Sequence, residues 1–206
     1  MLKSKVIFRL SICLILCAVL FAGCLSNDSG NSVIPANNDA GVFSGTITSA
    51  VVSEDSVLLI VENENETRYS RTNMVFILNN ETENYAENTD AYQSAVNKFI
   101  FVRYVIPDDG NLSTVINAAS AELFEEGEEL LLIRGTVEKI TLDADSEGKG
   151  SFRLNAANGT PIDLSYNSST YIAENIPAGS NVTVYAGPYL MESYPLQGWV
   201  YEVWLN

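Results

Sequence analysis

The chain of 206 residues contains no histidine. Histidine is the usual general base near neutral pH and the commonest metal ligand, so its absence argues against most catalytic triads and most zinc sites. No cofactor is expected. An enzyme built on this chain would depend on its 26 carboxylates. A glycosidase needs two of them across one cleft, and the sequence does not single out a pair.

Cysteine is absent after residue 24. The three cysteines are Cys13, Cys17 and Cys24, and the first two lie inside an apolar run near the N-terminus. The rest of the chain therefore cannot form a disulfide, and its stability must come from packing.

Bases are scarce: the chain has 11 Lys and Arg against 26 Asp and Glu. Because Lys3, Lys5 and Arg9 precede every acid, residues 24–206 hold 8 bases and 26 acids, a formal charge of −18. Such a negative field repels nucleic acid and anionic lipid headgroups. The composition thus predicts that nucleic acid is not a partner.

Residues 1–23 have the pattern of a secretory signal peptide. A basic start precedes an apolar run at residues 10–22, interrupted only by Ser11. An uncleaved membrane helix is the alternative, but spanning needs about 20 apolar residues and would place Arg9 in the membrane. We therefore expect export across a membrane.

The leader ends in Leu20-Phe21-Ala22-Gly23-Cys24, which resembles the lipobox of bacterial and archaeal lipoproteins. Phe21 departs from that pattern, in which leucine is usual. The resemblance implies that Cys24 carries a lipid, becomes the new N-terminus and anchors the chain to the outer face of the cell membrane. Residues 24–40 are mostly small and polar, which predicts a flexible tether.

Seven asparagines lie in Asn-x-Ser/Thr sequons, about twice the number expected by chance from the composition. Glycosylation would require export and exposure, whereas an Asn- and Thr-rich surface also produces sequons that are never used. The candidate glycosylation sites are Asn27, Asn65, Asn80, Asn111, Asn158, Asn167 and Asn181.

From Val42 onward, β-branched and aromatic residues alternate with turn clusters, which predicts a mainly β protein. In the second half the expected strands are residues 130–142, 151–156, 162–166, 181–190 and 198–205. Five strands, with Gly135 early in the first and Gly179 just before the fourth, resemble an OB-fold barrel spanning residues 128–206.

The first domain, residues 41–112, is expected to be either a diverged copy of this barrel or a β-sandwich-like domain. Residues 43–48 echo residues 133–138 in sequence. Its other expected strands and its one short helix lie at residues 57–61, 74–78, 99–106 and, for the helix, 90–97. A connecting helix is predicted at residues 113–127, with Ser113 as its N-cap and Gly127 as its stop.

Two groups of residues are candidate binding sites. Asp143, Asp145 and Glu147 alternate before a glycine, so they form a weak candidate cation site or else a solvated hairpin turn. Tyr185 and Trp204 are predicted to point outward from the fourth and fifth strands, where they form a ligand surface or meet a neighbouring domain. On the fifth strand, strict alternation predicts an inward face made of Trp199, Tyr201, Val203 and Leu205.

The sequence thus predicts a non-enzymatic cell-surface lipoprotein that binds or scaffolds envelope polysaccharide or protein. Its expected partners are the membrane, through the lipid anchor, and these envelope components. The alternative is a carboxylate-dependent hydrolase that acts on surface polysaccharide.

Overall fold

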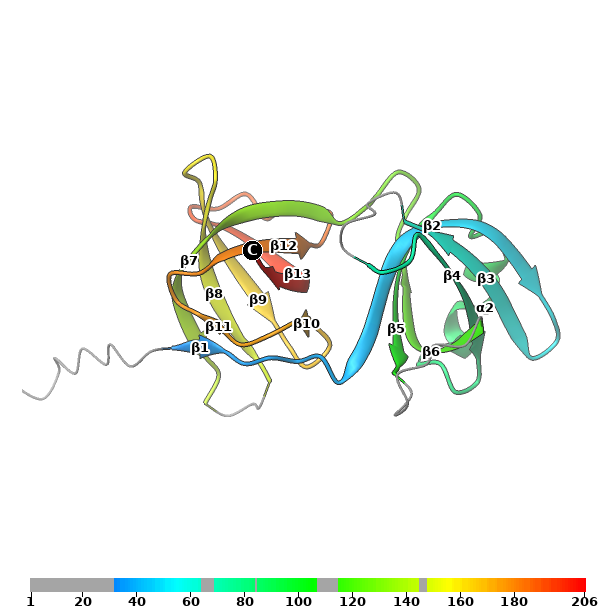
Figure 1. Cartoon of the computed structure of the whole chain (residues 1–206). Helices are drawn as coiled ribbons and strands as arrows, with labels where there is room; N and C mark the ends of the chain where they lie inside the picture. The colour runs from blue at the N-terminus through cyan, green and yellow to red at the C-terminus, as the bar shows by residue number, and fades with distance from the viewer. Residues whose placement is uncertain (1–31, 64–68, 84, 107–114, 145–147) are drawn as a thin grey trace, which may run out of the picture. The chain divides into compact units, whose positions relative to one another are not determined.

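The computed structural model describes residues 32–63, 69–83, 85–106, 115–144 and 148–206 (Figure 1). These residues form mainly β-strands, as predicted. Several sequence-based predictions lie outside the described residues: the signal peptide, Cys24, Asn27, Asn65, Asn111, Asp145 and Glu147.

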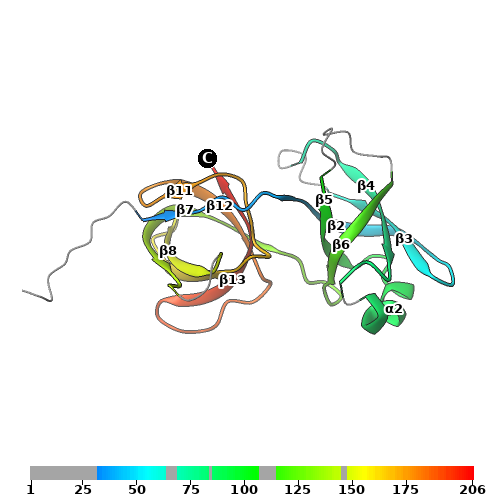
Figure 2. The ribbon, with the colours of Figure 1, turned by 90° about the horizontal axis from the view of Figure 1, so that it is seen from below.

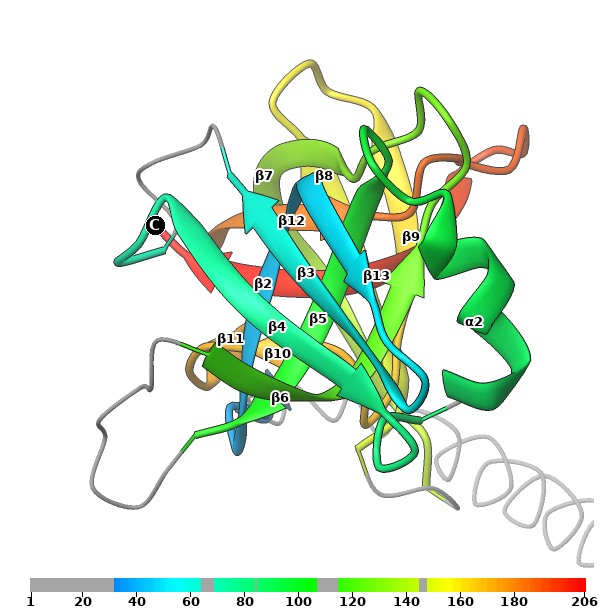
Figure 3. The same ribbon diagram turned by 90° about the vertical axis from the view of Figure 1, so that its right-hand side faces the viewer.

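The first domain is a closed five-stranded barrel. Its strands are β2 (Ala40–Val52), β3 (Ser56–Glu62), β4 (Asn73–Asn79), β5 (Phe99–Val105) and β6 (Val115–Leu123). They close in the order β2-β3-β4-β6-β5, with only the β4–β6 pairing parallel (Figure 3). The domain is therefore an OB-like barrel, and the sandwich alternative is wrong.

Alternating apolar residues fill this first barrel. Val57, Leu59 and Val61 on β3 are all fully buried, as the two-residue period of a strand requires. Helix α2 (Tyr85–Gln93) packs against β2, β3, β4 and β6. The helix starts earlier than the predicted residue 90, because Tyr85 and Tyr92 lie two turns apart on one face, where their buried rings stack 6.4 Å apart.

The predicted connecting helix at residues 113–127 is wrong, because most of this segment is strand β6. Its buried side chains, Ile116 and Ala118, follow the strand period. β6 pairs with β4 on one side and β5 on the other, so it closes the barrel and removes two open edges. The first barrel thus extends to Leu123 rather than to residue 112.

The second domain is also a closed five-stranded barrel. Its strands are β7 (Leu131–Leu142), β8 (Gly150–Ala156), β9 (Pro161–Tyr166), β12 (Asn181–Ala186) and β13 (Leu196–Leu205). They run in the order β13-β12-β7-β8-β9, and parallel pairing of β13 with β9 closes the ring (Figure 2). Two short strands, β10 (Tyr171–Ile172) and β11 (Ile176–Pro177), replace the helix found in the first barrel.

The predicted inward face of β13 is confirmed at Val203, which is buried in the core, but not at Trp199, which is 43% exposed. Val200, which is not part of the predicted face, is buried in the core as well. A register shift causes this change of face, because Tyr185 pairs with Glu202 while the next residue of β12 pairs with Val200. The extra residue of such a bulge moves the following side chains to the other face.

The two barrels share a turn that follows the third strand. Residues 79–82 form it after β4, and residues 167–170 form it after β9. In both turns an Asn side chain accepts a hydrogen bond from the amide N–H two residues later. The Thr hydroxyl that ends each turn donates to a carbonyl of the fifth strand, at 2.8 Å in both barrels. This agreement supports the prediction that the two barrels are diverged copies.

Part of the predicted tether, residues 24–40, is not free but is bound to the second barrel. Strand β1 (Val33–Ile34) pairs antiparallel with β11, and Ile34 is fully buried in the second barrel's core. The Asn37 side-chain amide donates to the carbonyls of Ser168 and Thr170, both at 2.8 Å. We call residues 32–38 the strap, because they bind the second barrel before β2 enters the first.

Candidate functional site

The outer face of the second barrel carries a hollow of 590 Å³, which we call the groove. It lies across β7, β8 and β9 and is bordered by β13 and by the loop of residues 187–195 that joins β12 to β13. Its lining side chains include Lys139, Thr141, Ser151, Arg153, Asp163, Ser165, Tyr189, Met191, Gln197 and Trp199.

Strand alternation places polar groups on the floor of the groove. On β8, Phe152 and Leu154 are buried in the core, so Ser151 and Arg153 point outward. On β9 the same alternation turns Asp163 and its neighbours on that face outward.

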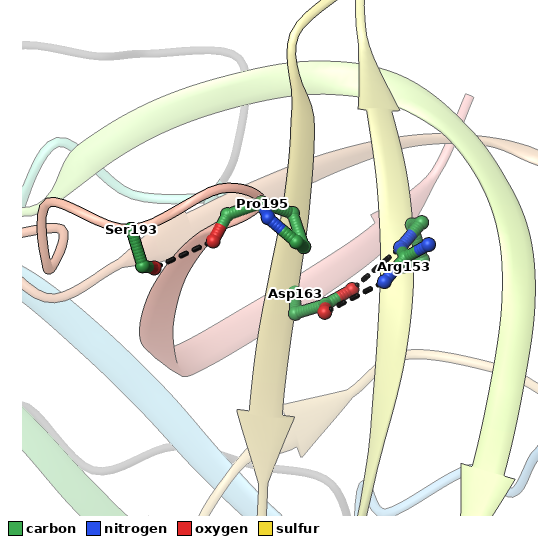
Figure 4. A network of polar contacts seen from close by, with 4 residues as sticks. All are labelled: Arg153, Asp163, Ser193 and Pro195. Carbon is green, nitrogen blue, oxygen red and sulfur yellow. Dashed lines mark hydrogen bonds and ion pairs between the residues drawn. The ribbon is translucent and has the colours of Figure 1, made fainter.

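Arg153 and Asp163 form a bidentate ion pair on this floor (Figure 4). The Arg153 Nε donates to Asp163 Oδ1 at 2.8 Å, and Nη2 donates to Oδ2 at 2.9 Å. The hydrogen bonds from Arg153 lower the pKa of Asp163, which keeps this carboxylate ionised. The general acid of a glycosidase needs a raised pKa instead.

Apolar side chains border the polar floor. Tyr189 is 72% exposed and Met191 is 62% exposed. Hydrogen bonds hold their loop: the Tyr189 hydroxyl donates to the Glu128 carboxylate, and Met191 N donates to the Gln197 carbonyl at 2.8 Å. Within the same loop, Ser193 Oγ donates to the Pro195 carbonyl at 2.5 Å (Figure 4). The groove thus combines exposed rings with hydroxyl, amide and charged groups on a fixed framework.

The predicted ligand surface at Tyr185 and Trp204 is not exposed, so that prediction is wrong. Tyr185 is 7% exposed, and Trp204 is half-buried against the same cluster. This cluster also contains Phe101 and Val42 of the first barrel. The two aromatic residues therefore meet a neighbouring domain, which was the alternative interpretation.

The sequence did not identify the groove residues for two reasons. The sequence predicts a fourth strand that continues to residue 190, and this puts Tyr189 in a strand rather than in the bordering loop. It also predicts Trp199 in the core, because strict alternation along the strand gives no sign of the bulge in β13. Tyr189 and Met191 lie close to the predicted turn at Pro195, and this position is a sign that they belong to a loop rather than to a strand.

The other candidate sites have these positions. Asp143 is exposed at the end of β7, and no group of three or more His, Cys, Asp or Glu suited to a metal occurs among the described residues. Asn80, Asn158 and Asn181 are exposed and Asn167 is half-buried. Use of these sequons remains a prediction. Within the same described part of the chain, no helix is both long and apolar enough to cross a membrane.

Neither a protein-family model nor a curated protein matches the chain. Solved structures match it at low identity. The p202 HIN1 domain in complex with a 12-mer double-stranded DNA is 12% identical, covering 88% of this chain and 97% of that one, with a TM-score of 0.28. A murine DNA-binding protein bound to double-stranded DNA is 11% identical, covering 80% and 96%, also with a TM-score of 0.28. The cytoplasmic molybdate-binding protein ModG is 13% identical, covering 69% and 86%, with a TM-score of 0.24.

These matches correct one prediction about partners. The negative net charge predicts that nucleic acid is not a partner, yet three of the matching structures contain double-stranded DNA. Net charge describes the whole chain, whereas binding depends on how charge is distributed over a surface. The exclusion therefore does not hold. At TM-scores below 0.3 the matches assign no ligand to this chain.

Proposed function

We propose that the chain is a non-enzymatic binding module that holds a segment of cell-surface polysaccharide in the groove of its second barrel. The position of the groove carries this proposal. OB-fold barrels bind oligosaccharides and oligonucleotides on the face of their second and third strands, next to the loop between the fourth and fifth strands. Here those elements are β8, β9 and residues 187–195, which surround the hollow.

The lining of the groove supports a sugar ligand. Tyr189 and Trp199 offer exposed apolar ring faces, while Ser151, Ser165 and Gln197 offer hydrogen-bonding groups for hydroxyls. A volume of 590 Å³ lies within the usual range for ligand sites, about 300–1,000 Å³.

The acids of the groove favour binding without turnover. A glycosidase acts through two carboxylates that flank the scissile bond. Asp163 is the one acid among the described lining residues, and Arg153 holds it as a paired carboxylate. We therefore favour a binding module over the hydrolase alternative.

Replacing Tyr189 with alanine is expected to weaken polysaccharide binding about tenfold, because a ring at the border of the groove is lost. The measurement is affinity electrophoresis against soluble neutral glucan, xylan, glucomannan, polygalacturonate and methyl-esterified polygalacturonate. At least one of these polymers is expected to retard the wild-type chain.

Tyr194→Ala is the matched control. Tyr194 lies on the same loop and is 90% exposed, but it does not line the groove. This variant is expected to bind like the wild type. A wild-type chain that no polymer retards, or equal losses from the Tyr189 and Tyr194 changes, would contradict the proposal.

We also infer, from the leader, that lipid on Cys24 holds this module at the outer face of the membrane. The chain recovered from native membranes is expected to lack residues 1–23 and to carry the mass of an added lipid. Cys24→Ser is expected to release the chain into the soluble fraction without detergent. Intact mass spectrometry tests both statements, and an unmodified full-length mass would contradict them by making the leader a membrane helix.

A further inference from the structure

A second hollow, of 520 Å³, lies between the two barrels, and we call it the cleft. The first barrel contributes Lys98, Phe101 and Arg103 to its lining, and the second barrel contributes Trp199 and Tyr201. Trp199 lines both the cleft and the groove. The two hollows are therefore neighbours, and a ligand longer than one sugar would have both within reach.

Contacts between the barrels hold the cleft walls in place. The Tyr201 hydroxyl of β13 donates to Glu122 of β6 at 2.5 Å, and the Tyr201 ring packs edge-on against Phe101 with centroids 5.1 Å apart. Elsewhere in the junction, the Tyr69 hydroxyl donates to the fully buried Glu202 at 2.6 Å. The cleft is thus bounded by hydrogen-bonded and packed groups from both domains.

Arg103 brings a buried hydrogen-bond donor to the lining of the cleft. Its Nη1 donates to the Ser168 carbonyl at 3.3 Å, but its buried Nε has no hydrogen-bond partner among the described residues. Burial lowers the pKa of Arg103, while the negative charge of Glu83 acts in the opposite direction. A shift in the β5–β6 register falls between Arg103 and Tyr104, and bulges of this kind redirect side chains next to binding sites. A buried donor without a partner is costly, so an acceptor supplied by a ligand would relieve that cost.

Bases are concentrated along this path. Of the 8 bases after residue 23, half line the groove or the cleft: Lys98, Arg103, Lys139 and Arg153. Among the described residues, the acids in the same linings are Glu83, Glu122, Glu125 and Asp163. The two hollows therefore carry balanced charge on an otherwise strongly acidic chain, so they repel a ligand with a few negative groups less than the rest of the surface does.

We propose that the groove and the cleft together bind an acidic polysaccharide, one that contains uronic acid, with a uronate carboxylate accepting hydrogen bonds from Arg103. This inference rests on the proposed function and adds the class of sugar and the second half of the site. Carboxylate is the anion that a planar guanidinium recognises through paired N–H groups.

The observations favour an acidic glycan over nucleic acid. Binding of a phosphate backbone draws on an excess of bases, whereas here the acids in the two linings equal the bases in number. The hydroxyl and amide groups of the groove match sugar hydroxyls. A single-stranded oligothymidylate of 12 nucleotides is therefore included as a competing probe.

The test compares a hexamer of α-1,4-linked galacturonic acid with its methyl ester, which has the same length but no charge. Calorimetry is expected to give at least tenfold tighter binding of the acid hexamer by the wild-type chain. Arg103→Gln is expected to lower affinity for the acid hexamer about tenfold and to leave affinity for the ester unchanged. Arg134→Gln is the matched control, because Arg134 is an exposed base that lines neither hollow.

The outcomes separate this inference from the proposed function. If the wild type binds no polysaccharide at all, the proposed function fails. If it binds a neutral polymer or the ester as well as the acid hexamer, and Arg103→Gln changes neither affinity, the groove function stands and the acidic-ligand inference is overturned. Oligothymidylate that binds more tightly than the acid hexamer and depends on Arg103 would also overturn it. The wild-type comparison of acid with ester decides the case even if the Arg103 variant folds poorly.

Discussion

Replacing Ile34 with alanine is expected to destabilise the second barrel by about 3 kcal/mol. Ile34 is fully buried and packs in the same core cluster as Val137 and Val203. Truncation to alanine removes buried methyl groups and leaves a cavity that strands on all sides hinder from collapsing. The strap would also lose the apolar contact that holds β1 against β11.

Urea unfolding followed by tryptophan fluorescence measures this loss. The chain has two tryptophans, Trp199 and Trp204, and both lie on β13, so the signal reports on the second barrel. Val51→Ala is the control, because Val51 is 59% exposed in the first barrel, and its change is expected to stay within about 0.5 kcal/mol. An unfolding midpoint of Ile34→Ala equal to that of the wild type would mean that the strap adds nothing to the second barrel.

The strap illustrates what local sequence patterns do not reveal. Val33 and Ile34 are two apolar residues in a polar stretch, which is too short a run to predict a strand. Their partner β11 lies more than 100 residues further along the chain, and a tether is the natural prediction when only neighbours in sequence are considered. The same limitation applies to β6. The spacing of its apolar residues, Ile116 among them, is compatible with a helix as well as with a strand. The open edges of β4 and β5 decide between them, and those edges exist only in the folded barrel.

The strands that could be predicted are those with long alternating patterns and clear turns. Residues 151–156 and 162–166 were placed within a residue of β8 and β9, because Asn158-Gly159 marks the turn between them. The groove depends on two features with no such signal: the end of β12 at Ala186 and the bulge that turns Trp199 outward. The sequence therefore predicts the ligand site at Tyr185 and Trp204 instead, where the first barrel covers it.

Gly135 lies early in β7, and the structure shows the physical reason for a glycine at this position. A Cβ atom at this position would lie 2.3 Å from the Asn155 carbonyl oxygen and 2.9 Å from the Ala156 Cα. Both are backbone atoms of β8, so the contact cannot be relieved by moving a side chain. The equivalent Gly45 in the first barrel would meet the Glu62 carbonyl oxygen at 2.2 Å. In each barrel a glycine thus permits the first and second strands to approach closely.

Gly135→Ala is accordingly expected to destabilise the second barrel by about 3 kcal/mol, because β7 and β8 must move apart and weaken their ladder of hydrogen bonds. Tryptophan-monitored urea unfolding measures the change. Gly187→Ala is the matched control in the same barrel, since the nearest atom to its added Cβ is 3.7 Å away, an ordinary contact. Its effect is expected to stay below about 1 kcal/mol. Equal losses from the two changes would show that the close approach of β7 and β8 does not explain the glycine, because the reduced flexibility that alanine gives the unfolded chain acts in the stabilising direction at both positions.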